Sequence, residues 1–376
     1  MNKAIQSMYC IRCEAEFAVG DYPYGCPCCL KTGHPASLSF RYNGRWEIHE
    51  KQEGMKRYAA MLPYEDFPTL GEGGTPVTRF PALAEEQGLG TVYTKNEFQN
   101  PTGSHKDRMN PLIVARAKEV GSRMIIAASS GNEGISLACY AAKAKLPCCI
   151  VVTQTIASGW KKAIEASGAA IITTETAMER WEVLREKTEK GWFCATNLLD
   201  PPVGSCSYGL QGYKTIAYEV YEQLPGELPD YLMIPVTRGD LLWGVCEGFL
   251  DLKNAGKIAE VPHLIAVEPF ERIERTKTLE DAAGHFEGKG DKTPSIAGTT
   301  VTIQSLLALE KTGGFAVSVS QEEAKRSVGE MGKHGLYLEA SSALLLPALK
   351  KLLRAGRIPK RASVMLVATS HGFKNP

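Results

Sequence analysis

Asn96-Glu-Phe-Gln-Asn-Pro-Thr-Gly-Ser-His-Lys-Asp-Arg108 carries more information about fold and chemistry than any other stretch of this 376-residue chain. It follows residues 91–95, for which we predict a strand, and its Pro/Gly turn leads into a predicted helix after Ser104. Lys106 therefore lies at the start of a helix. Burial near the positive end of a helix dipole makes the neutral amine easier to reach, as covalent bonding of a lysine to a carbonyl group requires. Taken alone, a lysine at a helix start is more often an exposed surface residue, so the neighbouring segments decide the interpretation.

Strand and helix patterns alternate through the rest of the chain. Apolar runs predict strands at residues 124–128, 148–152, 170–172, 231–236, 263–267, 315–319 and 363–368. Helical patterns cover residues 135–145, 160–166, 241–252 and 340–353, and a capping box at Ser320 and Glu323 predicts a helix towards His334. This alternation with continuous apolar strands predicts an α/β fold with open parallel sheets, each covered on both faces.

Three polar segments each follow a predicted strand. They are Ser129-Ser-Gly-Asn-Glu-Gly134, Thr237-Arg-Gly-Asp-Leu241 and Thr369-Ser-His-Gly-Phe-Lys374. Open α/β sheets bind ligands at the carboxyl ends of their strands, and a loop that leads into a helix presents backbone N–H groups to a phosphate. These segments and Lys106 together predict a ligand site.

Composition excludes several classes of protein. The 43 Lys+Arg residues against 42 Asp+Glu residues give a formal net charge of +1, which provides no electrostatic footprint for nucleic acid or an anionic membrane. No apolar run approaches the roughly 18 residues that span a bilayer, and the N-terminus lacks the apolar core of a signal peptide. We expect a cytoplasmic protein without membrane or nucleic-acid partners.

Five of the eleven cysteines lie within the first 29 residues. The pairs Cys10/Cys13 and Cys26/Cys29 have the spacing that places four thiolates on one structural Zn²⁺, although Cys28 could replace Cys29. Free or redox-active thiols are the alternative. Because residues 1–45 are poor in aliphatic side chains, a metal would stabilise their fold, and we expect a zinc-ribbon-like module there.

The motif Asn100-Pro-Thr-Gly-Ser-His-Lys-Asp-Arg108, followed by the three loops in this order, resembles the fold type II pyridoxal-phosphate (PLP) enzymes, the tryptophan-synthase-β-like group. Within that group the chain is most similar to threonine synthases, whose archaeal-type members also begin with a cysteine-rich ribbon. The resemblance implies two open parallel-sheet α/β domains with PLP between them, in a catalytic region of residues 46–376. The larger domain would comprise about 46–120 and 200–376, and the smaller one about 121–199.

The resemblance also implies a role for each site residue. Lys106 would bind PLP covalently and move the Cα proton of the substrate. Asn132 would contact the phenolic oxygen of PLP, and Thr369 would face its pyridine nitrogen. The residues expected to hold the PLP phosphate are Thr237, Arg238, Gly239, Asp240 and Leu241, and those expected to bind substrate are Ser129, Ser130, Gly131, Glu133 and Lys214.

Three departures from the family pattern concern ligand binding. Arg238 and Asp240 interrupt a loop that is usually glycine-rich, so Asp240 must point away from the phosphate or pair with Arg238. Glu133 replaces a threonine, and acts as a general base or as a helix N-terminal charge. Gly209 stands where an arginine would bind a substrate phosphate, and Lys214 offers only a point charge instead. An arginine at position 209 is therefore expected to improve binding of O-phosphohomoserine.

The leading functional hypothesis is a PLP-dependent lyase or replacement enzyme that resembles threonine synthase, which eliminates phosphate from O-phosphohomoserine and adds water. The alternative is β-elimination or β-replacement on serine, threonine or O-phosphoserine, as in dehydratases and cysteate-synthase-like enzymes. A cofactor-binding regulator without turnover and a zinc-ribbon nucleic-acid adaptor are the hypotheses from other classes. We expect a small amino-acid substrate and a homodimer.

Overall fold

The computed structural model describes residues 1–44 and 46–374, in two compact units. Unit 1 comprises Met1–Gly73 and Asn100–Thr215, and unit 2 comprises Gly74–Gln99 and the chain from Ile216 onward. This partition differs from the domain bounds that the resemblance implies, and those bounds stay a prediction.

Unit 1 begins with an antiparallel sheet of three strands in the order β2-β1-β3. Cys10 is the last residue of β1, and Cys26 immediately precedes helix α1. The elements of this N-terminal module are β1 (Ile5–Cys10), β2 (Glu16–Phe17), α1 (Pro27–Lys31), β3 (Leu38–Tyr42) and the 3-10 helix η1 (Gly54–Met61).

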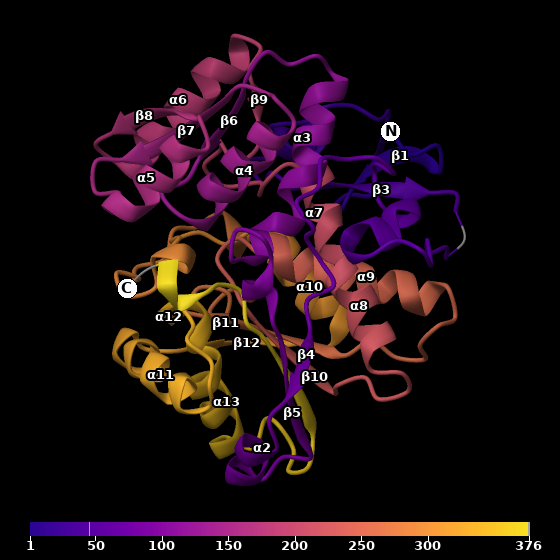
Figure 1. The fold of residues 1–376 in the computed structure, drawn as a ribbon, viewed down its shortest axis with the longest axis vertical. Coiled ribbons are helices and arrows are strands. Elements are labelled where there is room, and N and C mark those ends of the chain that lie inside the picture. Colours follow the sequence, from indigo (N-terminus) through magenta and orange to yellow (C-terminus); the bar gives the residue numbers. More distant parts are fainter. Residues whose placement is uncertain (45, 375–376) are drawn as a thin grey trace. The chain divides into compact units, whose positions relative to one another are not determined.

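The rest of unit 1 is built on a parallel sheet in the order β8-β7-β6-β9, which lies beside α4, α5 and α6 in Figure 1. Alternate residues of β7 face opposite sides. Cys149 and Val151 pack with Leu184 of α6, whereas Ile150 faces Gly134 of α4. The elements are η3 (His105–Arg108), α3 (Asn110–Glu119), β6 (Ile125–Ala128), α4 (Asn132–Lys143), β7 (Cys148–Thr153), α5 (Ser158–Ala166), β8 (Ala170–Thr174), α6 (Ala177–Glu189), β9 (Phe193–Cys194), α7 (Ser207–Leu210) and η4 (Gln211–Tyr213).

Unit 2 contains a six-stranded sheet in the order β12-β11-β10-β13-β5-β4, parallel except for the edge strand β4. Its main core joins apolar residues of the strands to those of α2, α11 and α13, while α9 and α10 pack together and against β11. The strands are β4 (Val77–Arg79), β5 (Thr91–Lys95), β10 (Tyr231–Pro235), β11 (His263–Glu268), β12 (Phe315–Ser318) and β13 (Ser363–Val367). The helices are α2 (Pro81–Gln87), η2 (Glu97–Gln99), α8 (Lys214–Gln223, most of which belongs to this unit), α9 (Asp240–Asn254), η5 (Asp281–Ala283), η6 (Pro294–Ile296), α10 (Ile303–Thr312), α11 (Gln321–Lys333), α12 (Ala340–Ala343), α13 (Leu345–Arg354) and η7 (Gly372–Lys374).

The predicted α/β fold with parallel sheets is confirmed. Each predicted strand is present within two residues of its expected bounds, and Ser320 and Glu323 form the predicted capping box of α11. The helix expected over residues 340–353 is divided into α12 and α13 at Leu344. Within the described residues, no helix is long and apolar enough to span a bilayer.

Candidate active site

Lys106 lies in the 3-10 turn η3, which the neighbouring residues of its motif hold in place. The Asp107 carboxylate is fully buried and accepts hydrogen bonds from the Thr102 backbone N–H and hydroxyl, both at 2.6 Å, and from the Ser136 hydroxyl at 2.6 Å. The Lys106 side chain remains 19% exposed. The motif therefore fixes the backbone of this lysine and leaves its amine within reach of a ligand.

The polar loop after β6 contributes a carboxylate beside that amine. Glu133 is the second residue of α4, and its Oε2 lies 3.4 Å from Lys106 Nζ. Asn132, the first residue of α4, is also buried. Within unit 1 the structure thus brings together two of the predicted site residues, Lys106 and Glu133.

The hydroxyls of the same loop shape the turn that leads into α4. Ser129 Oγ accepts hydrogen bonds from the backbone N–H groups of Gly131 at 3.3 Å and Gly134 at 3.0 Å. Ser130 Oγ accepts one from the Thr153 N–H at 3.2 Å and lies 3.5 Å from Arg180 Nη1. Arg180, on α6, therefore places a positive charge beside Ser130, a predicted substrate-binding residue. Arg180 itself was not predicted from the sequence.

In unit 2, the segment 237–241 links β10 to α9 as a tight turn. Gly239 has a φ of +72°, and a Cβ added there would lie 2.1 Å from Ser305 Oγ. Only glycine fits this close approach without strain. A positive-φ glycine directly before a long helix is a geometry that suits a phosphate group, so this loop fits the phosphate of PLP.

Side chains from outside the loop anchor its carbonyl groups. Arg272 is fully buried and donates to the carbonyls of Val236 at 2.9 Å, of Thr237 at 3.4 Å, and of Gly298. The Arg238 carbonyl accepts hydrogen bonds from Thr302 Oγ1 at 2.6 Å and Gln304 Nε2 at 3.1 Å. In a trans peptide the N–H points opposite to the carbonyl. Because the carbonyls point toward Arg272, Thr302 and Gln304, the N–H groups of the same peptides point to the other side of the loop.

The Asp240 carboxylate is directed toward Gln304, whose Nε2 donates a hydrogen bond to its Oδ1. Its negative charge can therefore point away from a phosphate bound at this loop. The charges of Arg272 and Glu268 compensate each other, with Nε and Oε2 3.3 Å apart and both side chains fully buried. Burial raises the pKa of Glu268 and lowers that of Arg272. Arg272, Thr302 and Gln304 were not predicted from the sequence. The only hint of them was that the loop they contact is charged rather than glycine-rich, which calls for compensating partners.

We expect Arg272→Lys to weaken PLP binding. A lysine keeps a positive charge beside Glu268 but cannot reach two carbonyls as a guanidinium fork does. Losing a charge-assisted bond worth roughly 1.5–3 kcal/mol corresponds to a loss of about 10- to 150-fold in PLP affinity. Equilibrium dialysis measures this loss, with Arg275→Lys as the control because Arg275 is 63% exposed. Pyridoxal, which has no phosphate, should bind both variants equally, and a parallel loss of pyridoxal would contradict a role in phosphate binding.

Thr369 lies directly beyond β13, the strand adjacent to β10 in the sheet. Its Oγ1 is 2.6 Å from Ser342 Oγ, which also accepts a hydrogen bond from the Ser370 N–H at 3.0 Å. All three side chains are buried. Ser342 thus orients the hydroxyl that the resemblance assigns to the pyridine nitrogen of PLP.

Lys214 and Gly209 occupy positions that the sequence analysis did not foresee. Lys214 is 3% exposed, its Nζ lies 4.6 Å from the centre of the Tyr42 ring, and it donates to Gln211 Oε1 at 3.3 Å. A Cβ at Gly209 would lie 2.5 Å from Met109 Cγ and 2.6 Å from Ile113 Cγ1. The expectation that an arginine at position 209 would improve substrate binding is therefore wrong, because the close packing of α7 against α3 leaves no room for a side chain.

Gly209→Ala should consequently destabilise the protein. Overpacking of this kind costs typically about 1–3 kcal/mol. Thermal unfolding measures the effect, and Gly159→Ala is the matched control because a Cβ at Gly159 of α5 meets nothing within 4 Å. Equal melting temperatures for Gly209→Ala and the wild type would contradict the packing argument.

The four cysteines at residues 10, 13, 26 and 29 form a compact cluster. Their Sγ atoms all lie within 4.8 Å of one another, with Cys10 and Cys29 separated by 3.6 Å and Cys13 and Cys26 by 3.7 Å. Cys28 is exposed and is not part of this cluster. Burial raises the pKa of Cys10, Cys26 and Cys29 to about 12, so without a metal these thiols are protonated at neutral pH. Four sulfur ligands that converge in this way suit tetrahedral Zn²⁺.

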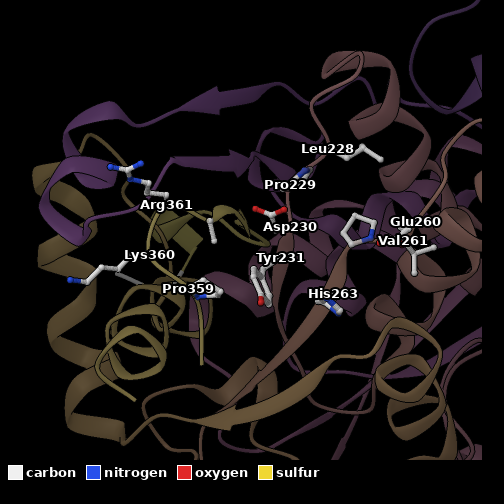
Figure 2. Close-up of a pocket in the computed structure, with 12 residues that line it drawn as sticks. Leu228, Pro229, Asp230, Tyr231, Glu260, Val261, His263, Pro359, Lys360 and Arg361 are labelled. Atoms are coloured by element: carbon white, nitrogen blue, oxygen red, sulfur yellow. The ribbon is translucent and has the colours of Figure 1, made fainter. Parts of the chain in front are cut away.

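A surface cavity of about 470 Å³ lies elsewhere in unit 2, at the amino ends of β10, β11 and β13. Figure 2 shows Asp230, Tyr231 and His263 at these strand ends, together with the exposed side chains of Lys360 and Arg361. The loops 237–241 and 369–374 follow the carboxyl ends of β10 and β13. The cavity is therefore at the opposite edge of the sheet and belongs to no part of the candidate active site.

Comparison with known proteins identifies the family of this chain. A family model described as pyridoxal-phosphate dependent enzyme matches residues 68–370. The chain therefore belongs to the pyridoxal-phosphate-dependent enzymes, with the fold type II architecture.

The curated relatives include several threonine synthases. That of Methanocaldococcus jannaschii is 28% identical, over 98% of this chain and 92% of the relative. That of Halalkalibacterium halodurans is 30% identical, over 86% of this chain and 89% of the relative. The chain is thus an enzyme that resembles threonine synthases.

Two solved structures illustrate how widely this fold is used. A fungal L-serine ammonia-lyase from Rhizomucor miehei has a TM-score of 0.68 at 21% identity, over 81% of this chain and 95% of its own. Threonine deaminase isoform 2 from Solanum lycopersicum has a TM-score of 0.67 at 20% identity, over 79% and 83%. At these identities the likeness concerns the fold alone.

Proposed function

We propose that the protein binds PLP covalently at Lys106 and converts a small amino acid by elimination or replacement. The observation that carries the proposal is the fixed turn of Lys106, whose side chain is 19% exposed and whose amine lies 3.4 Å from Glu133 in the first turn of α4, in a chain of the PLP family. Bound PLP supplies an electron sink for charge that develops on the substrate carbon.

Each set of residues has a separate task in this proposal. The anchored loop of Thr237, Arg238, Gly239, Asp240 and Leu241 binds the phosphate through its N–H groups. Asn132 and Thr369 orient the PLP ring. Because the Thr369 hydroxyl is neutral, the ring withdraws electrons less strongly than it would beside a carboxylate. Ser129, Ser130 and Gly131 bind the substrate carboxylate, and Glu133 lies beside the Lys106 amine. The role of Lys214 in substrate binding stays a prediction, because its side chain is buried and donates to Gln211. Lys106 takes and returns the proton of the substrate carbon.

The reaction we propose first is that of the curated relatives, elimination of phosphate from O-phosphohomoserine and addition of water to give threonine. The alternative is β-elimination or β-replacement on serine, threonine or O-phosphoserine. One observation favours this alternative: α7 packs too closely on α3 at Gly209 to carry a phosphate-binding arginine. Weak turnover of O-phosphohomoserine is the expected consequence.

A substrate screen tests the proposed function. Purified, PLP-loaded protein is incubated with O-phosphohomoserine, O-phosphoserine, serine and threonine, and phosphate, ammonia and 2-oxo acid are measured. Threonine with phosphate indicates the first reaction, whereas ammonia with 2-oxo acid indicates β-elimination. No product from any of the four compounds would argue against both the threonine-forming reaction and β-elimination.

Further parts of the proposal concern the whole protein. We infer that Cys10, Cys13, Cys26 and Cys29 bind one structural Zn²⁺, since four converging sulfurs leave no open position for catalysis. We also propose a homodimer located in the cytoplasm. The near-neutral net charge of +1 accords with a protein that has no nucleic-acid partner.

A further inference from the structure

The carboxylate of Glu133 is buried and directed at the amine that the proposed function makes reactive. Its side chain is 9% exposed, and Oε2 lies 3.4 Å from Lys106 Nζ. Both residues belong to unit 1, Lys106 in the turn η3 and Glu133 in the first turn of α4. The separation between these two atoms is thus set inside one compact body.

A helix N-terminal charge alone does not account for this arrangement. An acidic residue in a first turn interacts favourably with the dipole while it stays exposed to water, whereas burying a carboxylate is costly unless it is paired. Here the Lys106 ammonium offsets that cost. The other nearby carboxylate, Asp107, is instead held by Thr102 and Ser136. Glu133 is therefore the carboxylate placed to exchange a proton with Lys106.

We propose that Glu133 is a catalytic residue that accepts protons from the Lys106 amine and returns them during turnover. This inference rests on the proposed function and names the proton acceptor in it. When neutral Lys106 takes a proton from a substrate carbon, a C–H bond breaks, an N–H bond forms and the amine becomes an ammonium. Transfer from Nζ to Oε2 then breaks one N–H bond and forms one O–H bond, which leaves a neutral amine and a carboxylic acid.

The consequence is that a single lysine can act at two carbons. Conversion of O-phosphohomoserine to threonine moves protons at Cα and at Cβ, so the amine must lose the first proton before it takes the second. Glu133 holds that proton or passes it to water. A nitrogen–oxygen separation of 3.4 Å is longer than that of a proton-transfer hydrogen bond, and such contacts commonly shorten when a ligand binds.

Isotope exchange tests the proton transfer directly. PLP-loaded protein is incubated with L-threonine in D₂O, and loss of the Cα proton signal is followed by NMR. In the wild type the proton reaches solvent through Glu133. We expect Glu133→Gln to exchange at least 10-fold more slowly, because a proton-transfer group contributes about 10²–10⁴-fold. Glu133→Asp should recover much of the rate, and Glu186→Gln, which changes a surface ion pair with Lys190, should match the wild type.

A second measurement needs no turnover. Apo protein is mixed with PLP at pH 7, and covalent attachment at Lys106 is trapped with borohydride and quantified by mass spectrometry over time. Because the carboxylate forms an ion pair with the amine that must attack PLP, Glu133→Gln should attach PLP at least threefold faster than the wild type, and Glu133→Asp should resemble the wild type.

The outcomes separate this inference from the proposed function. PLP attachment at Lys106 with equal exchange in the wild type and Glu133→Gln would leave the proposed function intact and overturn the proton-transfer role. Failure of Glu133→Gln and Glu133→Asp alike to attach PLP, with native circular dichroism, would make Glu133 a positioning residue and also overturn it. Attachment of PLP at another residue, or no exchange by the wild type, would overturn both.

Discussion

Lys106→Ala is expected to abolish conversion of any amino-acid substrate while PLP still binds through its phosphate. The variant loses both the covalent attachment and the base that moves the Cα proton, and a positioned proton-transfer group alone contributes about 10²–10⁴-fold to rate. The loop at Gly239 and its anchor Arg272 lie in unit 2 and are unaffected by the substitution. Product formation measured against the wild type gives the rate loss, and equilibrium dialysis gives the remaining PLP affinity.

Lys118→Ala is the matched control for this variant, because Lys118 is exposed on α3, the helix that follows η3. It should retain wild-type turnover. Substantial activity in Lys106→Ala, above about a tenth of the wild-type rate, would show that another residue performs the proton transfer.

The second large effect is expected in the N-terminal module. Cys26→Ser should abolish binding of one Zn²⁺ per chain and unfold the sheet of β1, β2 and β3. Structural zinc sites of this kind contribute apparent binding free energies of about 10–16 kcal/mol, and the few apolar side chains of this segment cannot replace that contribution. Metal analysis of protein purified without chelators and limited proteolysis of residues 1–45 are the two measurements.

Cys28→Ser is the control for the zinc experiment, since Cys28 is exposed and lies outside the four-sulfur cluster. It should keep full zinc content and resistance to protease. Wild-type protein without zinc, or with a Cys10–Cys29 disulfide after purification under reducing conditions, would refute the metal site.

The sequence was sufficient for the features that depend on local pattern. Continuous apolar runs such as 148–152 specify buried parallel strands, and the Ser320/Glu323 pair specifies the start of α11. The cysteine spacing predicted a four-sulfur site but left Cys28 as an alternative to Cys29, and the structure places the sulfurs of Cys10, Cys13, Cys26 and Cys29 within 4.8 Å of one another.

The features that escaped the sequence analysis depend on contacts between distant segments. Arg272 supports the proposed phosphate-binding loop although it lies 36 residues after Val236 in the sequence. Ser342 contacts Thr369, which lies 27 residues later. No local pattern distinguishes a buried arginine of this kind from a surface one. Gly209 was misinterpreted for the same reason: its role is set by Met109 and Ile113, which only the packing of α7 on α3 brings near.

Lys95 is a second buried lysine with which the reactivity of Lys106 toward PLP can be compared. It is fully buried in unit 2, forms an ion pair with Glu219 at 2.6 Å and donates to Gln223 Oε1 at 3.1 Å. These contacts identify a structural lysine, and its amine is not accessible to a ligand. Reactivity with PLP should therefore distinguish Lys106 sharply from Lys95.

Borohydride reduction of the PLP-loaded wild-type protein, followed by proteolysis and mass spectrometry, tests the central claim most directly. The account predicts one reduced pyridoxyl group per chain, on the peptide that contains Lys106. A label on Lys95 or any other lysine, or no label on protein that has been incubated with PLP, would contradict it.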